Sequence, residues 1–216
     1  MISRGNSVGQ GNTLQHHVRS HVGRRRSNNQ DSAVVIPAES PNSFHKHGWL
    51  FIVADGMGAH AGGEEASRIA VARIPEIYSD LKPKYSPPLA LSQSLRQANK
   101  EIHSKGESDP NYKGMGTTCS TLVLLPQGAI VGHVGDSRIY RVRGHDIEQL
   151  SRDHSLAWEV AAASGQNDPT QGANLPSVPK NIITRSMGPH SDLDLDLDGT
   201  SPVEQTYIFI LSSAGL

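Results

Sequence analysis

The fold of this chain is decided by one stretch, Val53-Ala-Asp-Gly56-Met-Gly-Ala-His60-Ala-Gly-Gly-Glu64. Its start overlaps Trp49–Ala54, a continuous apolar run bounded by glycines, which predicts a strand buried on both faces. From Gly63 to Leu81 apolar residues recur every three or four positions and predict a helix bent near Pro75. A carboxylate therefore stands in a glycine turn between strand and helix, where the Gly56 carbonyl can approach whatever that carboxylate binds.

Outside this stretch, helical and β patterns are grouped instead of alternating. Pro87-Pro88 opens a second helical stripe, and Thr117–Leu150 has the shorter period of antiparallel strands joined by turns. A short helix is expected at Leu156–Ala163, with strands at Asn181–Arg185 and Tyr207–Leu211. Grouped strands with clustered helices predict the α+β class or a sandwich of the αββα type.

Two kinds of irregular segment are expected. Residues 1–15 are polar and rich in Gly, Asn and Gln, which predicts a flexible N-terminal lead-in before a single domain over residues 16–216. Pro37–Lys46 and Ser164–Pro179 are rich in loop-forming residues, and the second is predicted to be a long mobile loop.

Composition narrows the class of protein. The 216 residues suit one domain, and 20 Lys+Arg against 21 Asp+Glu give a net charge of −1, which argues against nucleic acid as a partner. The longest apolar runs fall far short of the ~20 residues that span a bilayer, so no membrane association is expected. The single cysteine, Cys119, excludes an internal disulfide and a thiolate zinc cluster, and a cytoplasmic location is expected.

Further motifs carry a resemblance to a known family. Arg26–Asp31 fits R-x-x-N-x-D, Asp55–Gly63 fits D-G-M-G-x-H-x-x-G, and Gly116–Thr118 fits G-T-T. Gly135–Arg138 fits G-D-S-R, and Asp153–Ser155 fits D-H-S. In this order the motifs resemble those of the PPM family of metal-dependent serine/threonine protein phosphatases, the protein phosphatase 2C type.

The resemblance implies a fold, a reaction and site residues. The fold would be an αββα four-layer sandwich, two antiparallel sheets flanked by helices, with two Mn²⁺ or Mg²⁺ ions between the sheets. Asp31, Asp55 and the Gly56 carbonyl would hold the paired ions, and Asp136 a third; all these donors are the oxygens that hard cations prefer.

The same family pattern implies roles for two catalytic residues. Arg26 would clamp the substrate phosphate, and His60 would protonate the serine or threonine oxygen that leaves. A metal-activated water would thus hydrolyse phosphoserine and phosphothreonine in proteins, the products of serine/threonine kinases, and the enzyme is expected to be a monomer.

Two departures from the family pattern open an alternative. Where the family has S-D-G-L, this chain has Ser213-Ala-Gly-Leu216, so Ala214 replaces a metal-binding Asp. The family also continues to a last metal-binding Asp, so the domain is expected to be incomplete at its C-terminus and to lack the final strands. The alternative is a catalytically impaired pseudophosphatase that acts as a binding or regulatory module.

Several other motifs have plainer interpretations. The alternating Asp and Leu of Asp194–Gly199 resemble the start of a calcium loop, but Gln205 stands where a bidentate Glu is needed, and an edge strand is favoured. A cysteine phosphatase requires an arginine six residues after its cysteine. No arginine stands at that distance from Cys119, which is therefore expected in the core. Arg24-Arg25-Arg26 is interpreted as a solvated strand edge, and His17 and His21 have zinc spacing only on a helix.

Overall fold

The computed structural model describes residues 2–9, 12–24, 27–58, 61–165, 178–179, 182–199, 203–204 and 206–213. Strands and helices alternate little along the chain. The strands are β1 (Ile2–Gly9), β2 (Asn12–Arg19), β3 (Asp31–Ile36), β4 (Trp49–Met57), β5 (Gly116–Thr117), β6 (Cys119–Leu125), β7 (Gly128–Val134), β8 (Arg138–Arg143), β9 (Asp146–Gln149), β10 (Asp196–Gly199) and β11 (Ile208–Ser212). The helices are α1 (Pro41–His47), α2 (Gly62–Leu81), α3 (Pro87–Ser108), the 3₁₀ helix η1 (Pro110–Tyr112) and α4 (Leu156–Ala163).

The strands form two antiparallel sheets and a separate pair. The larger sheet has the order β10-β7-β6-β4-β3, with β5 paired to the end of β4, and the smaller sheet has the order β11-β8-β9. The antiparallel pair β1-β2 makes no ladder with either sheet in the described residues. The predicted α+β class with two antiparallel sheets is confirmed.

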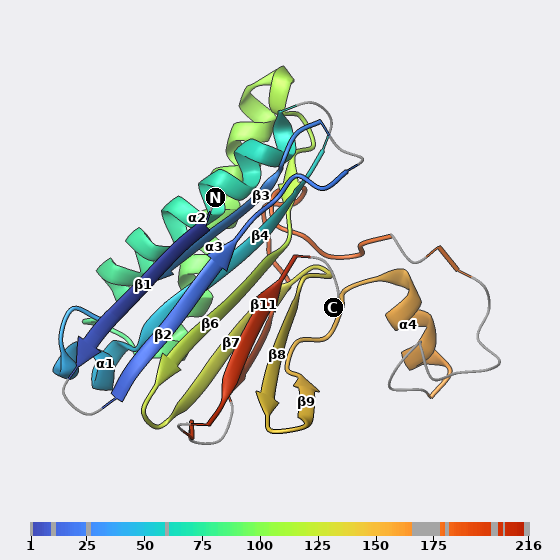
Figure 1. Ribbon diagram of the computed structural model, residues 1–216. Coiled ribbons are helices and arrows are strands. Elements are labelled where there is room, and N and C mark those ends of the chain that lie inside the picture. Colours follow the sequence, from blue (N-terminus) through green and yellow to red (C-terminus); the bar gives the residue numbers. More distant parts are fainter. Residues whose placement is uncertain are drawn as a thin grey trace.

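A helical layer covers the outer face of the larger sheet. Helices α2 and α3 pack against each other and lie along this sheet (Figure 1). Alternate residues of β4, namely Leu50, Ile52 and Ala54, join the core beneath these helices. Within the described ranges, no comparable pair of helices lies over the smaller sheet.

A second core lies between the two sheets. Trp49 of β4 and Leu122 of β6 are buried there with Ile139 of β8, and Phe209 and Leu211 of β11 pack on them. Strands β6 and β7 are buried along their whole length because helices cover one face and the smaller sheet the other. The alternation along β4 therefore assigns one face to each core.

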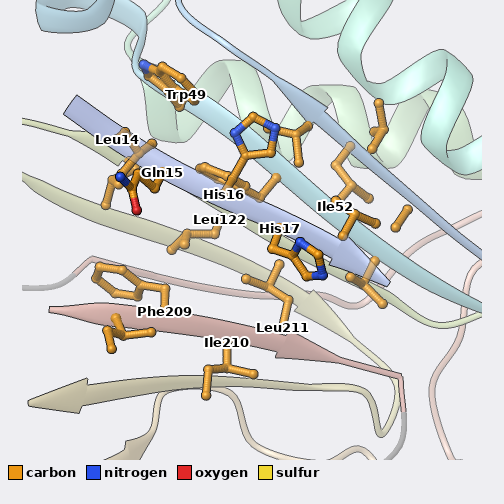
Figure 2. A pocket seen from close by; sticks show the side chains of 18 of the residues that line it. Leu14, Gln15, His16, His17, Trp49, Ile52, Leu122, Phe209, Ile210 and Leu211 are labelled. Carbon is orange, nitrogen blue, oxygen red and sulfur yellow. The ribbon is translucent and has the colours of Figure 1, made fainter. Parts of the chain in front are cut away.

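A groove of about 1410 Å³ opens between β2 and β11. Figure 2 shows Leu14 and His16 of β2 on one side of this groove, Phe209 and Leu211 of β11 on the other, and Leu122 of β6 between them. Among the described strands, β2 pairs only with β1 and β11 only with β8, so each keeps one open edge.

The N-terminal prediction was wrong in its secondary structure. Residues 1–15 were expected to be a flexible lead-in, but β1 pairs with β2 from Ile2↔Arg19 to Gly9↔Asn12. Strand pairing uses backbone N–H and C=O groups, so a polar segment can form a ladder without a buried face. Strand β2 begins before residue 16, where the domain was expected to start, and its Leu14, His16 and Val18 are half-buried.

Two further segments differ from expectation. The predicted loop over residues 37–46 contains α1, whose start is capped because Ser40 Oγ accepts a hydrogen bond from the Ser43 amide at 3.1 Å. The predicted strand at residues 181–185 is only a single bridge between Ser155 and Ile183 in its described part. The predicted mobile loop at residues 164–179 lies mostly outside the described residues.

None of the helices in the described ranges is long and apolar enough to cross a membrane.

The fully buried amide of Asn99 fastens α3 to the segment before β10. Its Nδ2 donates to the carbonyls of His190 and Ser191 at 2.9 and 3.0 Å, and its Oδ1 accepts from the Gly188 amide at 2.8 Å. We expect Asn99→Ala to lower the free energy of unfolding by about 2–3 kcal/mol, because buried backbone groups lose their partners. Urea unfolding measures this, with the exposed Gln97→Ala on the same helix as control. Equal stability of the two variants would contradict the assignment.

Candidate functional site

Two carboxylates stand side by side between the sheets. The register of β3 against β4 places Asp31 directly opposite Asp55, so their side chains share one face of the sheet. That face also carries Val35 and Phe51, which pack into the core between the sheets. Both carboxylates therefore lie at the end of the space between the larger and the smaller sheet.

The main chain of Asp55 is fixed by two buried threonines. The Asp55 carbonyl accepts hydrogen bonds from the Thr118 amide at 2.9 Å and from Thr117 Oγ1 at 3.0 Å. The Asp55 amide donates to Thr118 Oγ1 at 2.9 Å. The G-T-T motif thus holds the turn that presents the carboxylate, which gives this motif a physical role.

The glycines of the turn allow the first turn of α2 to lie directly against it. A Cβ on Gly56 would lie 2.0 Å from the carbonyl oxygen of Gly63, and a Cβ on Gly63 would lie 2.8 Å from the Gly56 carbonyl carbon. The Gln30 carbonyl accepts from the Gly56 amide at 3.1 Å and from Ser67 Oγ of α2 at 2.6 Å. Only glycine at both positions permits this contact between strand, turn and helix.

Asp136 lies in the turn where the chain crosses from β7 of the larger sheet to β8 of the smaller one. Ser137 Oγ is 2.7 Å from Thr118 Oγ1, so the same threonine side chain touches this turn and the Asp55 turn. Burial raises the pKa of the Asp136 carboxyl, and the nearby Asp153 carboxylate raises it further. Both causes disfavour the anion, as expected for a carboxylate placed to receive a cation.

The end of β11 reaches the carboxylate pair. Ser213 Oγ donates a hydrogen bond to Asp31 Oδ2 at 3.0 Å. Sequence reasoning missed this residue, because a serine after an apolar run is a common sequence with no particular signal. Its neighbour Ala214 lies outside the described residues.

The donor set of this site suits a hard divalent cation. Asp31, Asp55 and the Gly56 carbonyl offer oxygen ligands, which Mn²⁺ and Mg²⁺ prefer. Like charges directly opposite each other across two strands destabilise a sheet, and a cation between them would offset that repulsion. In the described part of the chain no group of three or more His, Cys, Asp or Glu residues is placed to hold one ion, so the carboxylate set there is small.

The other candidate residues divide into two groups. Arg26 and His60, predicted to bind phosphate and to donate a proton, lie outside the described residues. Cys119 is fully buried, and burial raises the pKa of its thiol to about 12, as a core residue would show. The calcium-like segment forms β10, which is an edge strand paired to β7, as favoured from the sequence.

An α+β sandwich with opposed carboxylates at the end of its space between sheets is the arrangement of a metal-dependent phosphatase. A sequence model of the protein phosphatase 2C family matches residues 19–179. The chain belongs to this family, and its relatives are named serine/threonine protein phosphatases.

Similar proteins cover nearly the whole chain. It is 36% identical over 197 residues to protein phosphatase PhpP of Streptococcus pneumoniae serotype 2. The matched region covers 90% of this chain and 76% of that protein. The solved structure of the S. agalactiae serine/threonine phosphatase is 31% identical, covers 98% of this chain and 78% of its own, and has a TM-score of 0.69. The PstP catalytic domain solved with 2 manganese ions is 26% identical, covers 89% of this chain and 74% of its own, and has a TM-score of 0.69.

The raised pKa of Asp136 predicts a measurable effect on stability. The folded protein holds this proton more tightly than the unfolded chain, so stability falls as the pH rises through the folded-state pKa. In chelator at pH 7.5, Asp136→Asn should raise the free energy of unfolding by about 0.5 kcal/mol or less, because solvent still partly screens this half-buried carboxyl. The gain should vanish below pH 4, near the ordinary carboxyl pKa.

Urea unfolding at both pH values tests this effect. Asp146→Asn in the exposed part of β9 is the matched control, and it should change little at either pH. A loss of stability in metal-free Asp136→Asn would show that the carboxylate is held by partners other than a cation.

Proposed function

We propose that this chain hydrolyses phosphoserine and phosphothreonine in proteins with the help of a pair of Mn²⁺ or Mg²⁺ ions. The observation that carries the proposal is the placement of Asp31 directly opposite Asp55 on the face between the sheets. The PstP catalytic domain, which was solved with 2 manganese ions, has a similar fold and supports this metal assignment. Asp31, Asp55 and the Gly56 carbonyl would hold the pair, and Asp136 a third ion.

Each residue has a defined task in this mechanism. When bound, the cations would lower the pKa of a water so that it can attack phosphorus. They would also neutralise the charge that develops on the phosphoryl oxygens. Arg26 would orient the phosphate through two parallel hydrogen bonds, and His60 would give a proton to the departing alkoxide oxygen. Ser213, by donating to Asp31 Oδ2, leaves the other carboxylate oxygen of Asp31 to face a ligand.

A second candidate function, a pseudophosphatase with a binding or regulatory role, rests on Ala214. The family places a metal-binding Asp there, directly after Ser213, whose Oγ donates a hydrogen bond to Asp31. An Asp at 214 would add a third carboxylate. We infer that its replacement weakens metal binding and slows turnover. In either case the partners would be phosphoproteins made by serine/threonine kinases, bound by a cytoplasmic monomer.

The metal assignment predicts that Mn²⁺ binding depends on the opposed carboxylates. Titration calorimetry should detect Mn²⁺ binding to the chain, because the proposed donors are oxygens, which this cation accepts. Asp55→Asn should weaken Mn²⁺ binding by at least about tenfold, the scale set by losing even an outer partner of a metal ligand. Asp146→Asn, the same change in the exposed part of β9, should leave it unchanged, and equal Mn²⁺ affinity of Asp55→Asn and the unaltered chain would overturn the assignment.

Restoring the family carboxylate distinguishes the two candidate functions. We expect Ala214→Asp to tighten Mn²⁺ binding and to raise the release of phosphate from a phosphothreonine peptide by about tenfold or more, because two cations need several anionic ligands. Gln97→Glu, which adds the same charge to the exposed face of α3, is the control. Vigorous Mn²⁺-dependent turnover by the unaltered chain would contradict the impairment, and no turnover from either form would favour the pseudophosphatase.

A further inference from the structure

A reciprocal pair of hydrogen bonds joins Gly135 to His154. The Gly135 amide donates to His154 Nδ1 at 3.2 Å, and the His154 amide donates to the Gly135 carbonyl at 2.7 Å. Gly135 has a positive φ of 109°, and a Cβ there would lie 2.6 Å from the Thr118 side chain. A glycine has no side chain with which to anchor itself, so the conformation of this turn depends on the partners of its backbone.

The direction of these bonds fixes the protonation of His154. A backbone amide only donates, so Nδ1 must be unprotonated and the ring proton must reside on Nε2. Nε2 lies 3.1 Å from Asp196 Oδ2 on the edge strand β10. The ring is nearly inaccessible, with 5% of the residue exposed. Nδ1 is thus occupied by the Gly135 amide, whereas Nε2 lies near Asp196 without a hydrogen bond in the described residues.

A second buried histidine contacts the carbonyl of the same residue, in the peptide that joins Gly135 to Asp136. His133 Nε2 lies 3.0 Å from the Gly135 carbonyl, and its Nδ1 lies 2.9 Å from Ser120 Oγ. Burial lowers the pKa of His133 to about 4, which keeps this ring neutral. The two ring centroids are 5.0 Å apart, so the pair encloses Gly135.

The backbone around His154 is itself fixed. The Thr184 amide donates to the His154 carbonyl at 2.9 Å. The preceding residue, Asp153, is bound by the Arg138 guanidinium of β8, with Nη2 to Oδ2 at 2.7 Å and Nε to Oδ1 at 2.9 Å. The main chain at residues 153 and 154 is thus held by Arg138 of the smaller sheet and by Thr184, which fixes where the imidazole stands beside Gly135.

We propose that His154 is a positioning residue for Asp136. This inference rests on the proposed function, in which Asp136 binds a metal ion. Asp136 follows Gly135 directly, so the orientation of the Gly135 peptide decides where the carboxylate lies. With the Gly135 amide bonded to Nδ1, the carboxylate is held ready for the cation. Without that bond, part of the energy of metal binding must restore the turn, and affinity falls.

Two substitutions separate the roles of the two ring nitrogens. In His154→Asn the amide oxygen occupies the place of Nδ1 and can still accept from Gly135. In His154→Gln the longer amide reaches the place of Nε2 and can still contact Asp196, but not the Gly135 amide. We expect roughly tenfold weaker Mn²⁺ binding for the Gln variant and an affinity within about threefold of the unaltered chain for the Asn variant.

A readout in metal-free protein accompanies the affinity measurement. Hydrogen exchange of the Gly135 amide, followed by NMR in chelator, should accelerate about tenfold or more in His154→Gln and remain slow in His154→Asn. If His154→Gln does not fold, His133→Leu removes a hydrogen-bond donor from the Gly135 carbonyl instead. His133→Gln is the control, because its amide can still donate to that carbonyl. Weaker Mn²⁺ binding is then expected for the Leu variant alone.

Asp136→Asn distinguishes the two possible failures. If this substitution weakens Mn²⁺ binding while both His154 variants bind like the unaltered chain, the positioning role is overturned and the proposed function stands. Equal losses in the Asn and Gln variants also overturn it, because the role of Nδ1 would then be only structural. If Asp136→Asn leaves Mn²⁺ binding unchanged, Asp136 is not a ligand, so the third-ion assignment and the positioning role both fail while the assignment of Asp31 and Asp55 stands.

Discussion

The hydroxyl of Thr118 is the point on which the site depends. It accepts the amide proton of Asp55 at 2.9 Å and shares a hydrogen bond of 2.7 Å with Ser137, and the residue is completely buried. A buried hydroxyl is costly unless its bonds are made, so this arrangement holds only when both turns are in place. The turn of the strand-helix unit and the turn that crosses between the sheets are thus formed together, and each carries a carboxylate of the proposed metal site.

The carboxylates of the site lower the stability of the protein when no cation is bound. Asp31 and Asp55 face each other across two strands, and burial raises the pKa of Asp136, so the protein without a cation carries repulsion and a poorly solvated charge. Such costs are typical of sites kept for function, where local stability is given up for a ligand. Family membership is consistent with this view.

Local sequence patterns predicted most elements of the fold, while the roles of the site residues remain predictions. The strand, turn and helix around Asp55 and the helix Leu156–Ala163 agree with the structure because their periodicities and glycines act locally. The structure pairs Asp31 with Asp55, while Arg26 and His60 remain predictions. Periodicity could not reveal the strand β1, whose pairing is by backbone, or contacts between distant residues. The Ser213 bond to Asp31 joins positions 182 residues apart, and the His154 bond to Gly135 uses a residue whose motif gave it no assigned role.

The central claim is that Asp31 and Asp55 form one cation site between the sheets. Crystals of the chain grown with Mn²⁺ and measured at the manganese absorption edge would locate the ion directly by its anomalous scattering. The account predicts an anomalous peak in contact with carboxylate oxygens of both Asp31 and Asp55 and with the Gly56 carbonyl oxygen. A manganese peak bound elsewhere, with the two carboxylates touching only protein or water, would contradict it.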